Sequence, residues 1–143
     1  MNGCMKRRPA HTEDADREEP SDQYGKEKKM PYIHSNVSVK ITEEQRIHLK
    51  EGLGKAISIF EGKSEHGLML RFSEDCCMYH QGSCQFPTAC VQVYLFGEQK
   101  KQAYLDFTKE ICGLYGQVLH ISGEHVYITY ETADAWGCNY RNS

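Results

Sequence analysis

Apolar and polar residues alternate along residues 31–39, PYIHSNVSV, and this period of two predicts a strand. One side of the extended segment carries Ile33, Ser35, Val37 and Val39, and the other side carries Tyr32, His34, Asn36 and Ser38. The aliphatic side is expected to face a core, so we place the start of a globular unit at this strand.

The next segment has the spacing of an amphipathic helix. Residues 42–45, Thr-Glu-Glu-Gln, have the form of a capping box, which marks the start of a helix. Apolar residues then recur at intervals of three and four and form one stripe: Leu49, Leu53, Ala56, Ile57 and Phe60. The helix is expected to end near Gly62. Alternating residues at 68, 70 and 72 predict a second strand, which an irregular cysteine-rich stretch follows as far as Pro87.

The same pattern then occurs a second time. Residues 89–97, ACVQVYLFG, predict a third strand, and residues 98–115 predict a helix with Gly116 as its stop signal. The stripe of this helix is Tyr104, Phe107, Ile111 and Leu114, and the fourth strand contains Val126, Ile128 and Tyr130. A Glu-His pair precedes both the second and the fourth strand, at residues 65–66 and 124–125. We therefore interpret the domain as two copies of one unit.

The predicted order is β-α-β-β-α-β, which defines an α+β fold made of two β-α-β repeats. Right-handed crossovers place both helices on one face of a single four-stranded sheet. The other face has no helix to cover it and displays several apolar residues, which favours contact with further subunits.

Residues 1–29 have a different composition from the rest of the chain. They contain no Val, Ile, Leu, Phe or Trp, and they carry seven acidic and seven basic residues. Such a segment cannot bury enough apolar surface to fold, so we predict a disordered charged tail at 1–29 and a folded domain at 30–143. In a bacterial gene, Lys26-Glu27 could also encode a ribosome-binding sequence just upstream of Met30. We interpret residues 1–29 as over-read upstream sequence, with a genuine tail as the alternative.

Charge and cysteine content narrow the function classes. The net charge of −3 belongs to residues 31–143, and no basic stripe is present, so neither nucleic acid nor a membrane is an expected partner. No apolar signal-peptide core follows the basic residues 6–8, which predicts a cytoplasmic protein with reduced thiols. Release to the extracellular space without a signal peptide, with a receptor as partner, is the alternative. No cofactor is expected.

The junction between Met30 and Pro31 carries the candidate chemistry. If translation starts at Met30 and this methionine is removed, Pro31 becomes a free secondary amine. An α-amine titrates near ~8, and an apolar pocket disfavours its cation and lowers the pKa further. Such an amine can take up and return a proton near neutral pH, whereas a prolyl amide cannot.

These residues resemble one known family. A strand that begins with Met-Pro, Gly62-Lys63 after the first helix, VYITY at residues 126–130 and Trp136-Gly137 near Asn139 are similar to the macrophage migration inhibitory factor branch of the tautomerase superfamily. The resemblance covers residues 30–142. It implies a homotrimer with active sites between subunits, and tautomerisation of phenylpyruvate-like 2-oxo acids, as a phenylpyruvate tautomerase or L-dopachrome isomerase does. In animals the family also implies a cytokine role.

The resemblance also implies roles for individual residues. Pro31 would be the catalytic acid and base, and Lys63 would bind the substrate carboxylate. The backbone N–H of Phe96 would bind a substrate oxygen. Aromatic walls would come from Tyr32 and Trp136, and from Tyr127 of a neighbouring subunit.

The sequence departs from the family pattern at the substrate pocket. Thr129 stands where the family has an asparagine, Cys138 stands where a second aromatic residue often follows Trp-Gly, and Gly67 lies near the position of a substrate-contacting tyrosine. The cytokine's Cys-x-x-Cys pair is also missing at the third strand. These differences affect substrate selectivity more than reaction class.

Two other functions stay open. A protein that keeps the fold without useful turnover would be a cytokine mimic or binding protein. The residue types of Cys77, His80, Cys84 and Cys90 also allow a zinc-stabilised binding module, although their spacing matches no common zinc knuckle. The other histidines, His34, His48, His120 and His125, are expected in surface or capping roles.

Overall fold

The computed structural model describes residues 30–142, and the predicted tail at residues 1–29 lies outside the described residues. The main sheet has four strands in the order β2-β1-β3-β4. They are β1 (Tyr32–Val37), β2 (Met69–Ser73), β3 (Ala89–Phe96) and β4 (Val126–Ala133). Strand β1 is parallel to β2 and antiparallel to β3, and β3 is parallel to β4. The sheet therefore consists of two parallel pairs joined through its central strands.

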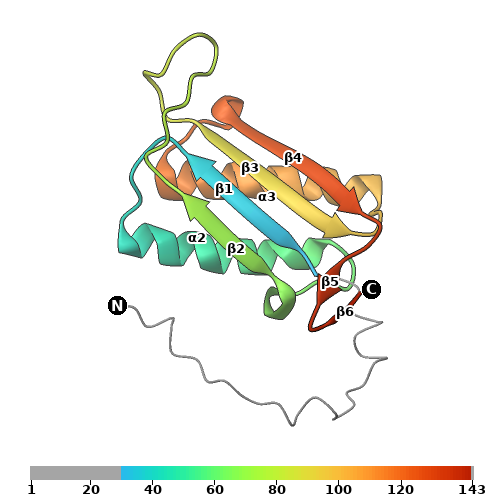
Figure 1. Cartoon of the computed structure of the whole chain (residues 1–143). Helices are drawn as coiled ribbons and strands as arrows, with labels where there is room; N and C mark the ends of the chain where they lie inside the picture. Colours follow the sequence, from blue (N-terminus) through green and yellow to red (C-terminus); the bar gives the residue numbers. More distant parts are fainter. Residues whose placement is uncertain (1–29, 143) are drawn as a thin grey trace.

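Both long helices cover the same face of this sheet (Figure 1). They are α2 (Glu43–Ala56), which continues into the short 3₁₀ helix η3 (Ile57–Ile59), and α3 (Lys101–Leu119). Two more 3₁₀ helices, η4 (Glu65–Gly67) and η5 (Gly123–His125), contain the repeated Glu-His pairs. The predicted β-α-β-β-α-β order and its internal repeat are thus confirmed. No helix of residues 30–142 is long and apolar enough to cross a membrane.

The helix α2 begins at the predicted capping box. The Thr42 side chain accepts the backbone N–H of Gln45 at 3.1 Å, and the Gln45 side chain accepts the backbone N–H of Thr42 at 3.0 Å. Two N–H groups that have no partner within the helix are satisfied in this way.

The predicted bounds of the second helix were wrong at both ends. The helix α3 begins at Lys101, three residues after the predicted start, and passes through Gly116 to Leu119. Its last turn buries Leu119 and is closed by His120, whose φ of 58° is left-handed. The burial of one more turn outweighs the weak helix propensity of glycine, and a histidine takes the capping position that glycine often occupies.

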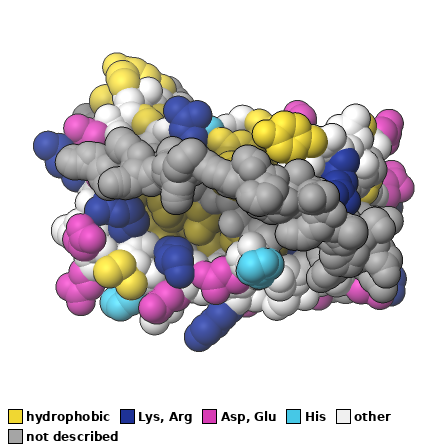
Figure 2. Space-filling view, turned by 60° about the horizontal axis from the view of Figure 1, so that its bottom comes forward, with side chains coloured by type: hydrophobic (Ala, Val, Ile, Leu, Met, Phe, Trp, Pro, Cys, Tyr) yellow, Lys and Arg dark blue, Asp and Glu magenta, His cyan; other side chains and the backbone are white. Residues whose placement is uncertain are grey.

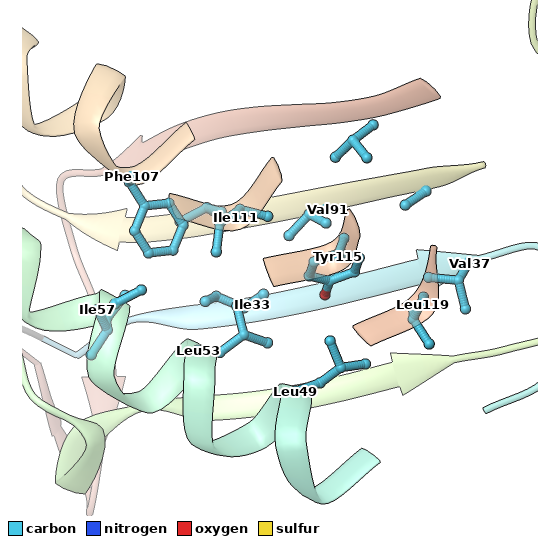
Figure 3. Close-up of a cluster of buried hydrophobic side chains, with 14 of the residues drawn as sticks. Ile33, Val37, Leu49, Leu53, Ile57, Val91, Phe107, Ile111, Tyr115 and Leu119 are labelled. Carbon is cyan, nitrogen blue, oxygen red and sulfur yellow. The ribbon is translucent and has the colours of Figure 1, made fainter. Parts of the chain in front are cut away.

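The core lies between the helices and the covered face of the sheet (Figure 3). Alternate residues of β1 and β3 point into it, as the period of two predicted, and they meet the apolar stripes of both helices. Its fully buried members include Ile33, Val37, Leu49, Leu53, Ile57, Phe60, Val91, Val93, Leu95, Phe107, Ile111, Tyr115 and Ile121. The buried residues of this core cluster all fall between Ile33 and Val126.

The opposite face of the sheet carries polar as well as apolar side chains. Tyr32 and Tyr94 lie on it beside polar residues such as Asn36, whose amide donates to the backbone oxygen of Cys90 and to Gln92 Oε1. At its edge, His34 Nε2 lies 2.8 Å from the Ser73 hydroxyl. Burial, and after it the charge of Arg71, lowers the pKa of His34. Elsewhere on the surface, lysine and arginine are interspersed with aspartate and glutamate, as one face shows in Figure 2.

Candidate active site

Pro31 lies immediately before the central strand β1 and is buried. Its carbonyl oxygen accepts the backbone N–H of Met69, the first residue of β2, at 3.1 Å. The pairing of β1 with β2 thus fixes the position of the Pro31 carbonyl group. In the 143-residue chain, the Pro31 nitrogen is bonded to Met30.

Lys63 lies on the short segment that leads from α2 and η3 into β2. Gly62 makes the turn before it with a φ of 81°, a conformation that L side chains rarely adopt, and the Lys63 N–H donates to the Phe60 carbonyl at 3.0 Å. The Lys63 side chain is only 4% exposed. Lysines are rarely buried to this extent, so Lys63 is not an ordinary solvated surface residue.

The helix η4 anchors the segment after Lys63. Glu65 reaches back to α2, where its Oε2 atom lies 3.0 Å from Lys50 Nζ. Its carboxylate also occupies the space that a side chain at Gly54 would need, since a Cβ atom there would lie 2.4 Å from Glu65 Cδ. A side chain at Gly54 would therefore displace the Glu65 carboxylate from its present position beside Lys50.

Two aromatic pairs lie at the same end of the sheet as Pro31. The rings of Tyr32 and Tyr94, which are cross-strand neighbours, stack with centroids 5.4 Å apart. Phe96 ends β3, and its ring meets the half-buried Trp136 edge to face at 6.5 Å. Trp136 precedes the small hairpin of β5 (Gly137–Cys138) and β6 (Arg141–Asn142), which lies near the start of β1 in Figure 1.

Tyr127 is the predicted site residue that one chain does not bring to the others. Tyr127 on β4 pairs with Cys90 on β3. The β4 residue level with the Pro31 end of the sheet is Glu131, because it pairs with Tyr94, the partner of Tyr32, and it lies four residues after Tyr127. This separation is about 13 Å along the strands. The Tyr127 side chain is 60% exposed, so a second copy of the chain would be needed to bring it next to Pro31.

Sequence reasoning missed two features of the site region. Tyr94 was not singled out, because its contact with Tyr32 depends on the strand register. His125 was expected at the surface or in a cap, and this was wrong: it is 7% exposed and stacks on Phe86 at 3.8 Å. No periodic pattern in the irregular loop could reveal that Phe86 returns to η5. The capping role expected among the histidines is confirmed for His120.

The proposed zinc ligands do not converge. Within residues 30–142, no three His, Cys, Asp or Glu side chains are arranged to hold a metal ion. Cys77 and Cys84 are exposed, whereas Cys90 is half-buried on β3, where burial raises the pKa of its thiol. His80 instead contacts another histidine and a tyrosine.

Comparison with known families agrees with this arrangement. Residues 30–143 match the family described as macrophage migration inhibitory factor (MIF). The chain belongs to this family. The match covers the whole described MIF domain, including Pro31, Lys63 and Trp136. No curated protein sequence matches the chain closely enough to count as a relative.

Solved structures of MIF proteins share the fold. Leishmania major MIF2 is 28% identical with a TM-score of 0.74, over 80% of this chain and 97% of that one. The MIF homologue of Prochlorococcus marinus is 26% identical with a TM-score of 0.69, over 78% and 97%. A more distant structure, that of Pt0534 inactivated by 2-oxo-3-pentynoate, is 12% identical with a TM-score of 0.65, over 71% and 85%, and shows the shared fold alone. The tautomerase fold class is thereby confirmed.

Proposed function

We propose that this MIF-family protein, once its chain starts at Pro31, interconverts the keto and enol forms of phenylpyruvate-like 2-oxo acids. The observation that carries the proposal is the position of a buried proline at the start of the central strand, at the same end of the sheet as Phe96 and Trp136. Buried Lys63 lies on the segment that leads into the neighbouring strand. Membership of a family whose superfamily contains isomerases supports the reaction class.

The reaction requires one group that both accepts and returns a proton. The neutral Pro31 amine takes a proton from the carbon next to the ketone, the C–H electron pair forms the enol double bond, and the Pro31 cation delivers the proton, directly or through water, to the enolate oxygen. In the reverse direction the Pro31 cation returns its proton to that carbon. The Lys63 ammonium binds the carboxylate, and the backbone N–H of Phe96 donates to a substrate oxygen.

The active site in this proposal lies between subunits of a homotrimer. Within residues 30–142, no helix covers the sheet face opposite α2 and α3, and Tyr127 lies too far from Pro31 to reach it within the same subunit. A neighbouring copy supplies Tyr127 as one aromatic wall, while Tyr32 and Trp136 supply the others. Family members are typically homo-oligomers, which supports this arrangement.

The decisive experiment compares three proteins in a phenylpyruvate ketonisation assay. A chain that starts at Pro31 is expected to be active, its Pro31→Gly variant to keep the fold and lose most activity, and the uncleaved 143-residue chain to be nearly inactive. Intact mass verifies each N-terminus. As an independent probe, 2-oxo-3-pentynoate is expected to add to the Pro31 amine and to leave the uncleaved chain unlabelled. Equal rates for wild type and Pro31→Gly would show that the base lies elsewhere.

While Pro31 remains bonded to Met30, the nitrogen is an amide and cannot act as a base. In that form the non-catalytic alternative applies, that of a MIF-like cytokine mimic or binding protein. Intact mass of the protein isolated from its natural source separates the two functions. We place the enzyme in the cytoplasm, with release without a signal peptide as the condition for any receptor contact.

A further inference from the structure

The loop between β2 and β3 contains a tight hairpin that fixes His80. His80 and Ser83 exchange two backbone hydrogen bonds, at 2.9 and 3.1 Å, and both residues between them have positive φ, 58° for Gln81 and 75° for Gly82. This geometry matches a type I′ turn, whose twist suits a two-residue hairpin. The direction in which the His80 side chain leaves the backbone is therefore set locally.

His80 contacts two residues around the start of β4, His125 and Tyr127, through its two ring nitrogens. Its Nδ1 atom lies 3.1 Å from His125 Nδ1, and its Nε2 atom lies 3.2 Å from the Tyr127 hydroxyl. The rings of His80 and Tyr127 also meet edge to face, with centroids 4.9 Å apart. His125 is held in turn by stacking on Phe86 and is nearly buried.

The hydrogen-bond inventory of imidazole leaves two neutral arrangements for this chain of contacts. If His125 donates from Nδ1, His80 carries its proton on Nε2 and donates to the Tyr127 oxygen, so the tyrosine hydrogen can point to a substrate. If His80 donates from Nδ1, its bare Nε2 accepts the Tyr127 hydroxyl. In both arrangements the imidazole determines the direction of the hydroxyl. On the other side of His125, away from His80, the charged Glu124 Oε2 lies 3.7 Å from His125 Nε2.

We propose that His80 and His125 are positioning residues that orient Tyr127 toward the substrate bound at Pro31 of a neighbouring subunit. The proposal rests on the proposed function, because it assigns Tyr127 to that pocket. An exposed tyrosine on an outer strand would otherwise rotate freely, and ordering it upon substrate binding would cost entropy. The contact with His80 fixes the Tyr127 side chain before the substrate binds. Neither histidine touches the substrate.

The kinetic test uses chains that start at Pro31, since the described core lies between Ile33 and Val126 and the family match begins at residue 30. His80→Phe keeps an aromatic ring but removes both nitrogens, and it is expected to lower kcat/KM for phenylpyruvate about tenfold. His80→Gln, whose amide can still donate to Tyr127, is expected to recover most of this loss. His48→Phe, a change at an exposed histidine of α2, serves as the matched control and is expected to leave kcat/KM unchanged.

A double-mutant cycle separates positioning from stability. In a Tyr127→Phe background, His80→Phe should cause no further loss of kcat/KM, because the hydroxyl that it orients is already absent. Phe86→Leu weakens the stack that holds His125, and it is expected to lower Tm and to cause a smaller loss of kcat/KM than His80→Phe does. Light scattering checks that each variant keeps the oligomeric state of wild type. Independent losses from His80→Phe and Tyr127→Phe, or an unchanged rate in His80→Phe, would overturn the proposal.

A measurement without substrate distinguishes this inference from the proposed function. Long-range ¹H–¹⁵N spectra of the imidazoles, recorded on the full chain, should show a shift of the His80 Nε2 resonance in Tyr127→Phe. An unshifted resonance would overturn the contact and the inference with it. Absence of turnover in wild type that starts at Pro31 would instead overturn the proposed function, while the spectra would still decide whether His80 holds Tyr127.

Discussion

The buried pair of Ser35 and Tyr115 allows a quantitative prediction about stability. The two hydroxyl oxygens lie 2.6 Å apart and join the central strand to α3, and Ser35 is only 1% exposed. Replacing Tyr115 by Phe leaves the Ser35 hydroxyl without this partner in the core. The expected loss is about 1–3 kcal/mol of unfolding free energy at pH 7, the cost of an unsatisfied buried polar group. Ser35→Ala should cost a similar amount, and the double variant less than the sum of the two.

The same residue makes stability depend on alkaline pH. Burial raises the pKa of Tyr115 from 10.0 to about 12, and the Ser35 hydrogen bond opposes this effect in part. The unfolded chain loses the phenolic proton first, so the stabilisation is fully present below pH 10 and is lost as the pH rises through about 12. The difference of 2 pH units corresponds to about 3 kcal/mol in all, and at pH 11 the loss is about 1.4 kcal/mol.

Urea unfolding at pH 7, 9, 10 and 11, followed by circular dichroism, measures both effects. Subtracting the Tyr115→Phe curve from that of wild type isolates this residue from other alkaline groups such as Tyr130, whose pKa burial also raises. The advantage of wild type over Tyr115→Phe should shrink between pH 9 and 11. A constant difference over this range would refute the reasoning, because it would mean that Tyr115 titrates alike in the folded and unfolded chains.

Three further predictions concern the site, the assembly and helix packing. Lys63→Ala should raise KM for phenylpyruvate about 10- to 100-fold, because the carboxylate contact is present in both ground and transition states. Removing a positive charge near Pro31 should also raise the pKa of the Pro31 amine, so the acidic limb of the kcat/KM profile should move to higher pH. Unchanged steady-state kinetics would remove Lys63 from the site. Light scattering at micromolar concentration should give three times the monomer mass, and a stable monomer would exclude a shared site with Tyr127. Gly113→Ala, where a Cβ atom would meet nothing within 4 Å, should stabilise the protein in thermal unfolding by about 0.5–1 kcal/mol. Gly52→Ala should give less or none, because its Cβ atom would lie 2.5 Å from Leu114 Cδ1, and an equal gain would show that the two helices adapt freely.

The sequence was sufficient to predict the order of the main elements of the fold. Hydrophobic periodicity is a local property, so the strand side of Ile33, the stripe from Leu49 to Phe60 and the repeated unit could all be read from it and are confirmed. The capping box at Thr42 was predictable for the same reason, since its partners lie three residues apart. The roles assigned to Pro31 and Lys63 came from resemblance to the family and remain predictions.

Contacts between distant segments were decided only by the tertiary structure. The helix α3 continues through Gly116 because Leu119 finds a place in the core, which outweighs local propensity. His80 and His125 are 45 residues apart, and only the path of an irregular loop brings their rings together. No local pattern encodes that path, because its energy comes from contacts that exist only after the sheet has formed. The burial of Lys63 and the separation of Tyr127 from Pro31 likewise follow from how the strands are ordered and aligned.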